Sequence, residues 1–197
     1  MEVKSLVKLT KGRAKICLDN GADFVLYKKE YEAYGIEEGA YLPEEKYQEI
    51  CQEILIPRCK KRGLNLLEKQ DRTEKNLRDK LSEGGYPEAV IDIAIDYINS
   101  FGYIDDARMA ASHIRFYQDT RSRQRLKQDL LSKGVSSEVI ERVLDEEYTA
   151  DEQELIKSLL IKKGYDSEDA TYEQRAKMYR FLMSRGFSSD SINRVLN

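Results

Sequence analysis

The sequence predicts a mainly α-helical fold made of tandem three-helix repeats in an elongated array, with a small N-terminal β-hairpin extension. One pattern recurs around Gly85, Gly134 and Gly186, which lie 49 and then 52 residues apart. In each copy, apolar residues stand eight and four positions before the glycine, and mostly apolar residues follow it at matching offsets. A repeat this long is typical of stacked units, each too small to bury its apolar face without its neighbours. Near the N-terminus, partial alternation of apolar residues instead favours strands.

The N-terminal extension is expected to begin with strands. Residues 3–9 and 13–18 are apolar or β-branched, and Asp19-Asn20-Gly21 supplies the residues of a tight hairpin turn. Residues 22–27 would form the return strand. Residues 28–41 are rich in charge and tyrosine, and their two glycines disfavour a long helix.

Helices are expected from Glu44 onward, where apolar residues recur at three-to-four-residue spacing. Pro57 should end or kink the first of these helices. Thr73, and either Ser136 or Ser137, are expected to cap later ones, and glycine suits a left-handed helix end. The chain is therefore divided into an extension and three three-helix repeats, at residues 1–55, 56–101, 102–149 and 150–197.

The central repeat has the clearest pattern. Asp105 is expected to cap its first helix, which would bury a face formed by Ala107, Ala110, Ala111, Ile114 and Tyr117. A segment rich in basic residues then connects this helix to a second amphipathic helix, which ends at Gly134.

The composition excludes several function classes. The formal net charge of −3 argues against a protein that coats nucleic acid by bulk electrostatics, so any nucleic-acid contact must be local. The chain has no run of about 18 apolar residues and no signal-peptide core, so we expect a cytoplasmic protein. Its cysteines indicate neither a disulfide framework nor a metal site; they are Cys17, Cys51 and Cys59.

Nothing in the sequence indicates catalysis, a cofactor or a metal, and we interpret the protein as a non-enzyme. His113 is the single histidine, and it is expected to be a packing or surface residue beside the apolar face of its helix. The carboxylates follow solvated helical patterns rather than the spacing of a general acid and base. A glycine-rich phosphate loop is also absent.

Basic residues remain as candidates for function. A cluster at the entrance of one helix comprises Arg121, Arg123, Arg125 and Lys127. These side chains could meet phosphates or carboxylates, and the alternative is a solvated helical face. Comparable strips precede the other two glycines: Arg72, Lys75 and Arg78, and Arg175, Lys177 and Arg180. The acidic run from Glu138 to Glu154 is expected to stay solvated.

Several motifs together are specific: Gly102-Tyr103-Ile104-Asp105-Asp106, Arg125-Leu126-Lys127-Gln128-Asp129-Leu130, Lys133-Gly134-Val135, Gly85-Tyr86-Pro87 and Arg185-Gly186-Phe187-Ser188. Through them, roughly residues 57–197 resemble the RecX family, bacterial regulators of the RecA recombinase. The sequence departs from the family's usual phenylalanine, glycine and glutamate at Met109, Ser122 and Asp129.

The resemblance implies a curved, elongated monomer that lies in the groove of the RecA filament on single-stranded DNA. Such a binder would reduce strand exchange, ATP hydrolysis and coprotease activity, as part of DNA repair and the SOS response. The expected contacts to the filament or to its DNA are Arg108, Arg115, Arg121, Arg123, Arg125, Lys127, Arg175, Lys177 and Arg180.

Two other functions stay open at this point. An independent helical-repeat DNA-binding protein would bind bare DNA with an affinity that falls steeply with salt. A protein-only adaptor would be indifferent to charge reversal at Arg123 and Arg125.

Overall fold

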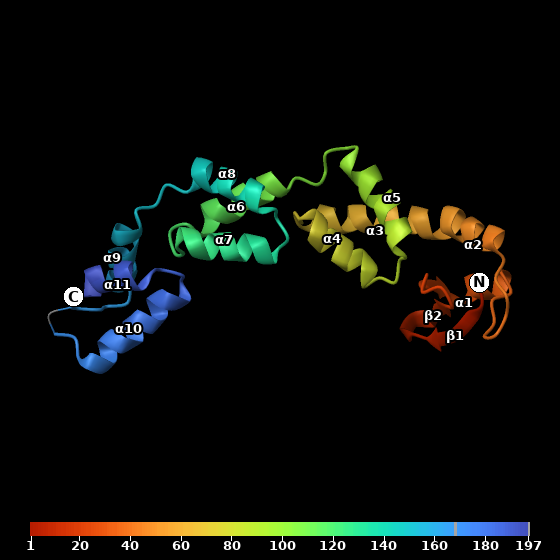
Figure 1. Ribbon diagram of the computed structural model, residues 1–197, viewed down its shortest axis with the longest axis horizontal. Coiled ribbons are helices and arrows are strands. Elements are labelled where there is room, and N and C mark those ends of the chain that lie inside the picture. The colour runs from red at the N-terminus through yellow and green to blue at the C-terminus, as the bar shows by residue number, and fades with distance from the viewer. Residues whose placement is uncertain (168, 197) are drawn as a thin grey trace. The chain divides into compact units, whose positions relative to one another are not determined.

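The computed structural model describes residues 1–167 and 169–196 (Figure 1). The chain divides into two compact units, which meet in sequence between Asp105 and Asp106. The first unit holds the N-terminal sheet and one three-helix domain, and the second holds two three-helix domains. The predicted tandem three-helix architecture is confirmed.

The N-terminal sheet has three antiparallel strands in the order β1-β2-β3, drawn in red in Figure 1. They are β1 (Val3–Lys8), β2 (Arg13–Leu18) and β3 (Phe24–Tyr27), and a 3-10 turn (Thr10–Gly12) joins the first two. On β2, Ala14, Ile16 and Leu18 are buried, because alternate side chains of a strand face the same side. The N-terminal β-structure is therefore a three-stranded sheet, with β2 at its centre, and its inner face belongs to the core of the first unit.

A helical stretch then leads into the first domain. It follows the short α1 (Lys28–Ala33) and runs through α2 (Glu44–Ile50), a π-helical turn (Cys51–Leu55) and α3 (Ile56–Lys69). Pro57 was predicted to end or kink this helix, and the helical stretch continues through it. It lies in the first turn of α3, where a missing N–H is tolerated, and the irregularity is the π turn immediately before it.

The three domains repeat one arrangement of helices. The first domain adds α4 (Glu74–Ser82) and α5 (Glu88–Asn99) to α3. The second comprises α6 (Asp106–Tyr117), α7 (Arg123–Ser132) and α8 (Ser137–Glu147), and the third α9 (Glu152–Lys162), α10 (Tyr172–Ser184) and α11 (Ser189–Leu196). Among the described residues, no helix is long and apolar enough to cross a membrane.

The middle helix of each domain begins with a hydroxyl cap. Thr73, Ser122 and Thr171 stand at equal intervals of 49 residues, and each side-chain oxygen accepts a hydrogen bond from the backbone N–H three residues on. Because the middle helices begin at equal intervals, the unequal spacing of the glycines that follow them must come from the lengths of the helices. The second middle helix, α7, has 10 residues and α10 has 13, so the three additional residues of the third repeat lie inside its middle helix.

The glycine after the middle helix is a docking point in two of the domains. Gly85 has a φ of +82°, and its carbonyl accepts a hydrogen bond from the Val25 N–H of β3 at 3.1 Å. Gly186 has a φ of +84°, and its carbonyl accepts one from the Ser122 hydroxyl at 2.6 Å. A side chain is excluded at both places, since a Cβ would lie 2.2 Å from Val25 Cγ2 or 2.6 Å from Arg125 Cβ. The glycines therefore serve close packing as well as the left-handed turn.

Candidate functional site

The expected basic cluster lies where α6 passes into α7, but its side chains do not form one strip. Arg121 and Arg125 both bind the carboxylate of Asp129, with Arg125 Nε 3.1 Å from Asp129 Oδ1. The Arg121 guanidinium also lies 3.9 Å from the ring centroid of Tyr117. The Asp129 side chain is only 15% exposed, whereas that of Arg125 is 49% exposed, so a largely buried carboxylate holds two arginines at the junction of α6 and α7.

The other two members of the cluster face a different helix. Lys127 and Arg123 share Glu141 of α8, and Arg123 Nη2 also lies 2.7 Å from Asp145 Oδ1. Hydrogen bonds from Lys127 and then from Arg123 lower the pKa of Glu141. Arg123 and Arg125 lie two positions apart on α7 and therefore point to nearly opposite sides of the helix, so the four cations separate into two pairs: Arg125 with Arg121, which precedes α7, and Arg123 with Lys127.

The sequence predicted that the acidic run from Glu138 to Glu154 stays solvated, and this prediction is wrong for several of its carboxylates. Glu141 and Asp145 bind α7, Glu152 accepts the backbone N–H of Arg123 at 3.0 Å, and Glu147 lies 3.5 Å from Arg115 Nε. The physical reason is the three-helix fold, which brings the acidic face of α8 alongside the basic side chains of α6 and α7. The central charges are therefore largely compensated by neighbouring carboxylates. The side chain of Arg108, on α6, is exposed at the surface.

The basic side chains of α10 differ from the central ones. Arg175, Lys177 and Arg180 form no ion pair with any residue that the structure describes. Lys177 and Arg180 are exposed and share one face at a spacing of three residues, which Met183 extends. Arg175 is half-buried and points elsewhere around the helix.

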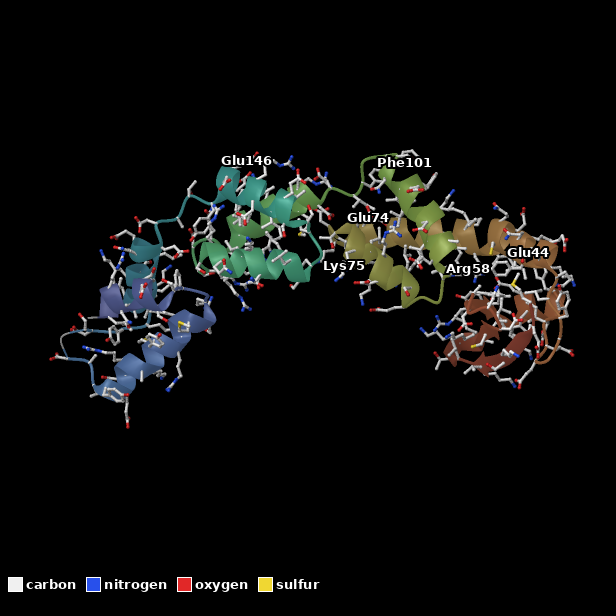
Figure 2. All side chains as sticks on the ribbon, viewed as in Figure 1. Glu44, Arg58, Glu74, Lys75, Phe101 and Glu146 are labelled. Carbon is white, nitrogen blue, oxygen red and sulfur yellow. The ribbon has the colours of Figure 1, made fainter. Side chains whose placement is uncertain are left out.

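The basic strip expected in the first domain is also compensated in part. Arg78 binds Glu74 and Asp92, and Arg72 donates a hydrogen bond to Asn76. Lys75, labelled in Figure 2, is exposed on α4.

Sequence reasoning missed a second cationic surface in the first unit. Arg58, Lys61 and Arg62 of α3 line an open cleft of about 480 Å³ together with Arg13 of β2 and Lys80 of α4. Arg58 is labelled in Figure 2. The available signal was the spacing of Arg58, Lys61 and Arg62, which places three cations on one face of a helix. Arg13 could not be added from the sequence, because only the docking of the sheet brings it there.

His113 packs in the second domain, as predicted. Its ring lies 4.7 Å from that of Tyr117, and its side chain is 11% exposed. Burial lowers the pKa of the imidazole, and the nearby Lys133 and Arg121 add to this effect while Asp129 opposes it. His113 is therefore neutral at neutral pH, and its Nε2 lies 3.9 Å from Asp129 Oδ2, too far for a hydrogen bond. No group of three or more His, Cys, Asp or Glu residues that could hold a metal is found in the described part of the chain.

Comparison with known families accounts for most of the chain. Residues 59–97, 105–144 and 150–196 match the first, second and third three-helix domains of RecX. The chain belongs to the RecX family. Regulatory protein RecX of Clostridium perfringens is 30% identical over 190 residues, which cover 93% of this chain and 88% of that protein. Regulatory protein RecX of Caldanaerobacter subterraneus is 28% identical, and the match covers 100% and 99% of the two chains.

Solved structures agree with this assignment. A crystal structure of a regulatory protein RecX matches with a TM-score of 0.61 and 25% identity, over 98% of both chains. The crystal structure of RecX from Lactobacillus salivarius matches with a TM-score of 0.56 and 26% identity, over 72% of this chain and 94% of that one. The first of these matches includes the N-terminal sheet, which lies outside the three RecX domains.

Proposed function

We propose that this RecX protein binds, as a cytoplasmic monomer, the filament that RecA forms on single-stranded DNA, and that it lowers strand exchange, ATP hydrolysis and coprotease activity. The observation that carries this proposal is the ordered set of three RecX domains over residues 59–196, in a chain whose relatives are named regulatory proteins. The protein is then a regulator that acts by binding, and its conserved architecture serves to present a surface.

The charge distribution favours a protein filament over bare duplex DNA. Bulk binding to DNA requires many uncompensated cations, because its strength comes from the release of counterions. Here the net charge is −3, and the central cations bind Asp129, Glu141 and Asp145 of their own domain. The face of α10 that carries Lys177 and Arg180 beside Met183 is exposed, and neither cation forms an ion pair with a described residue, which supports this face as the part of the expected surface that contacts the partner.

The structure also decides which variant tests the proposal. Reversing the charge of Arg121, Arg123 and Arg125 would break the contacts with Asp129 and Glu141, so a loss of binding could reflect damage to the domain. Reversing Lys177 and Arg180 removes no ion pair with a described residue. A matched control is the double reversal of Arg142 on α8 and Arg194 on α11, which are exposed and change the net charge equally.

The experiment measures binding to RecA filaments assembled on immobilised single-stranded DNA with a non-hydrolysable ATP analogue. We expect Lys177→Glu/Arg180→Glu to weaken binding by about tenfold, the equivalent of roughly 1.4 kcal/mol. Arg142→Glu/Arg194→Glu should bind like the unmodified protein. Failure of the unmodified protein to bind the filament would contradict the proposal, and equal losses in both variants would contradict the role of α10.

A further inference from the structure

The cleft in the first unit is lined by residues of four elements, β2, β3, α3 and α4, and by the segment that follows α4. Arg58, Lys61, Arg62 and Asn65 recur at positions i, i+3, i+4 and i+7 of α3 and form one wall. A neighbouring face of α3 is buried in the core through Cys59, Gly63 and Leu66, which fixes the direction of the basic face. The start of β2, the end of β3, and the end of α4 with the residues after it supply the remaining walls.

The cleft carries an excess of positive charge. Arg58 binds Glu30, and Lys80 Nζ lies 2.6 Å from Glu83 Oε2. Arg13, Lys61 and Arg62 form no ion pair with a described residue, which leaves three uncompensated cations in a protein whose formal net charge is −3. Burial raises the pKa of Tyr86 to about 12, so its hydroxyl adds no negative charge to the lining.

An aromatic ring stands at the same cleft. The Tyr27 side chain is exposed, and the Arg58 guanidinium lies 5.0 Å from the centroid of its ring. Glu30 holds both groups, because one of its carboxylate oxygens binds Arg58 and the other accepts the Tyr27 backbone N–H at 2.8 Å. The arginine and tyrosine are thus fixed as a stack with an accessible ring.

We propose that this cleft binds single-stranded nucleic acid, with phosphates on Arg13, Lys61 and Arg62 and a base on the Tyr27 ring. Guanidinium groups match phosphate oxygens in paired hydrogen bonds, and aromatic rings beside a basic groove serve as stacking platforms for bases. An acidic peptide would pair with the cations, but its carboxylates would not stack on the Tyr27 ring. The inference deepens the proposed function by assigning a DNA contact to the sheet and the first domain, yet its test contains no recombinase, so either can fail alone.

The test is a fluorescence-anisotropy titration of labelled oligothymidylate with the full chain at several salt concentrations. Three phosphate contacts predict a slope of about −2 for the logarithm of the association constant against the logarithm of salt concentration. Lys61→Gln/Arg62→Gln should reduce that slope to about −0.7 and weaken binding about tenfold or more. The control Lys8→Gln/Lys29→Gln removes the same charge from exposed positions of the same unit outside the cleft and should leave binding unchanged.

Tyr27→Leu distinguishes a nucleic acid from an acidic peptide. It should weaken binding of oligothymidylate by about fivefold or more, because it removes a stacking surface. A labelled polyglutamate serves as the competing probe. Absence of oligothymidylate binding, equal effects of the cleft and control variants, or polyglutamate binding as tight as oligothymidylate binding with no effect of Tyr27→Leu would each overturn the proposal.

Discussion

Replacing Gly186 by alanine should weaken the docking of the third domain on the second. The φ of +84° alone costs an alanine about 1–2 kcal/mol. The new Cβ would also lie 2.6 Å from Arg125 Cβ and 2.8 Å from Ser122 Oγ, and overpacking of this kind costs about 1–3 kcal/mol. Neither contact is with the flexible end of a side chain, so the neighbours cannot simply move aside.

Gly164 is the matched control, because its φ is +66° and a Cβ there would meet nothing within 4 Å. We expect Gly164→Ala to lose about 1–2 kcal/mol and Gly186→Ala about 2–5 kcal/mol of unfolding free energy, measured by urea denaturation and far-UV circular dichroism.

Amide hydrogen exchange gives a local measurement of the same docking contact. The Ser122 N–H donates to the Arg185 carbonyl at 3.1 Å, so its exchange should accelerate in Gly186→Ala and not in Gly164→Ala. Equal destabilisation by the two substitutions, with equal protection of the Ser122 amide, would refute the docking role of the glycine.

Three further outcomes follow from buried contacts. Ser122→Ala should lower the unfolding free energy, measured by urea denaturation, by about 1–3 kcal/mol. The reason is that it removes a fully buried hydroxyl that both caps α7 and donates to the Gly186 carbonyl. A smaller loss would argue against this double role. Gly85→Ala should be partly rescued by Val25→Ala in a double-mutant cycle, whereas additive losses would show that the 2.2 Å contact is not the cause. Burial lowers the pKa of the His113 imidazole from 6.5. The stability that the neutral imidazole contributes is therefore complete above about pH 6.5 and is lost as the pH falls through the folded-state pKa. His113→Gln should therefore reduce the shift of the urea midpoint between about pH 7.5 and about pH 5.5, and an unchanged shift would contradict this.

The repeat architecture was predictable because its signals are local. Thr73 and Ser136 cap helices as expected, and the glycine at the end of each middle helix has a positive φ, as a left-handed helix end requires. Helical periodicity also identified Ala110, Ala111 and Ile114 as buried residues of the central domain.

The partners of the charged residues were not predictable in the same way. Arg123 and Glu141 are 18 positions apart, and Arg13 and Arg62 are farther apart still, so only the packed fold shows which charges meet. The sequence therefore indicated a basic strip where the structure has two compensated pairs. It also gave no reason to connect the N-terminal sheet with α3.

Ser122 shows how a departure from the family pattern can be understood only in three dimensions. A glycine there could not offer a hydroxyl, whereas Ser122 accepts the Arg125 N–H at 3.2 Å and donates to the Gly186 carbonyl. Its φ of −67° requires no glycine. The substitution thus adds a contact between the second and third domains.

The central claim, regulation of RecA, is tested most directly by single-stranded-DNA-dependent ATP hydrolysis. The cognate RecA is titrated with the unmodified protein, with Lys177→Glu/Arg180→Glu and with Arg142→Glu/Arg194→Glu. The account predicts inhibition at substoichiometric amounts by the unmodified protein and by the Arg142/Arg194 control, and weaker inhibition by the α10 variant. Unchanged hydrolysis at an excess of the unmodified protein would contradict it.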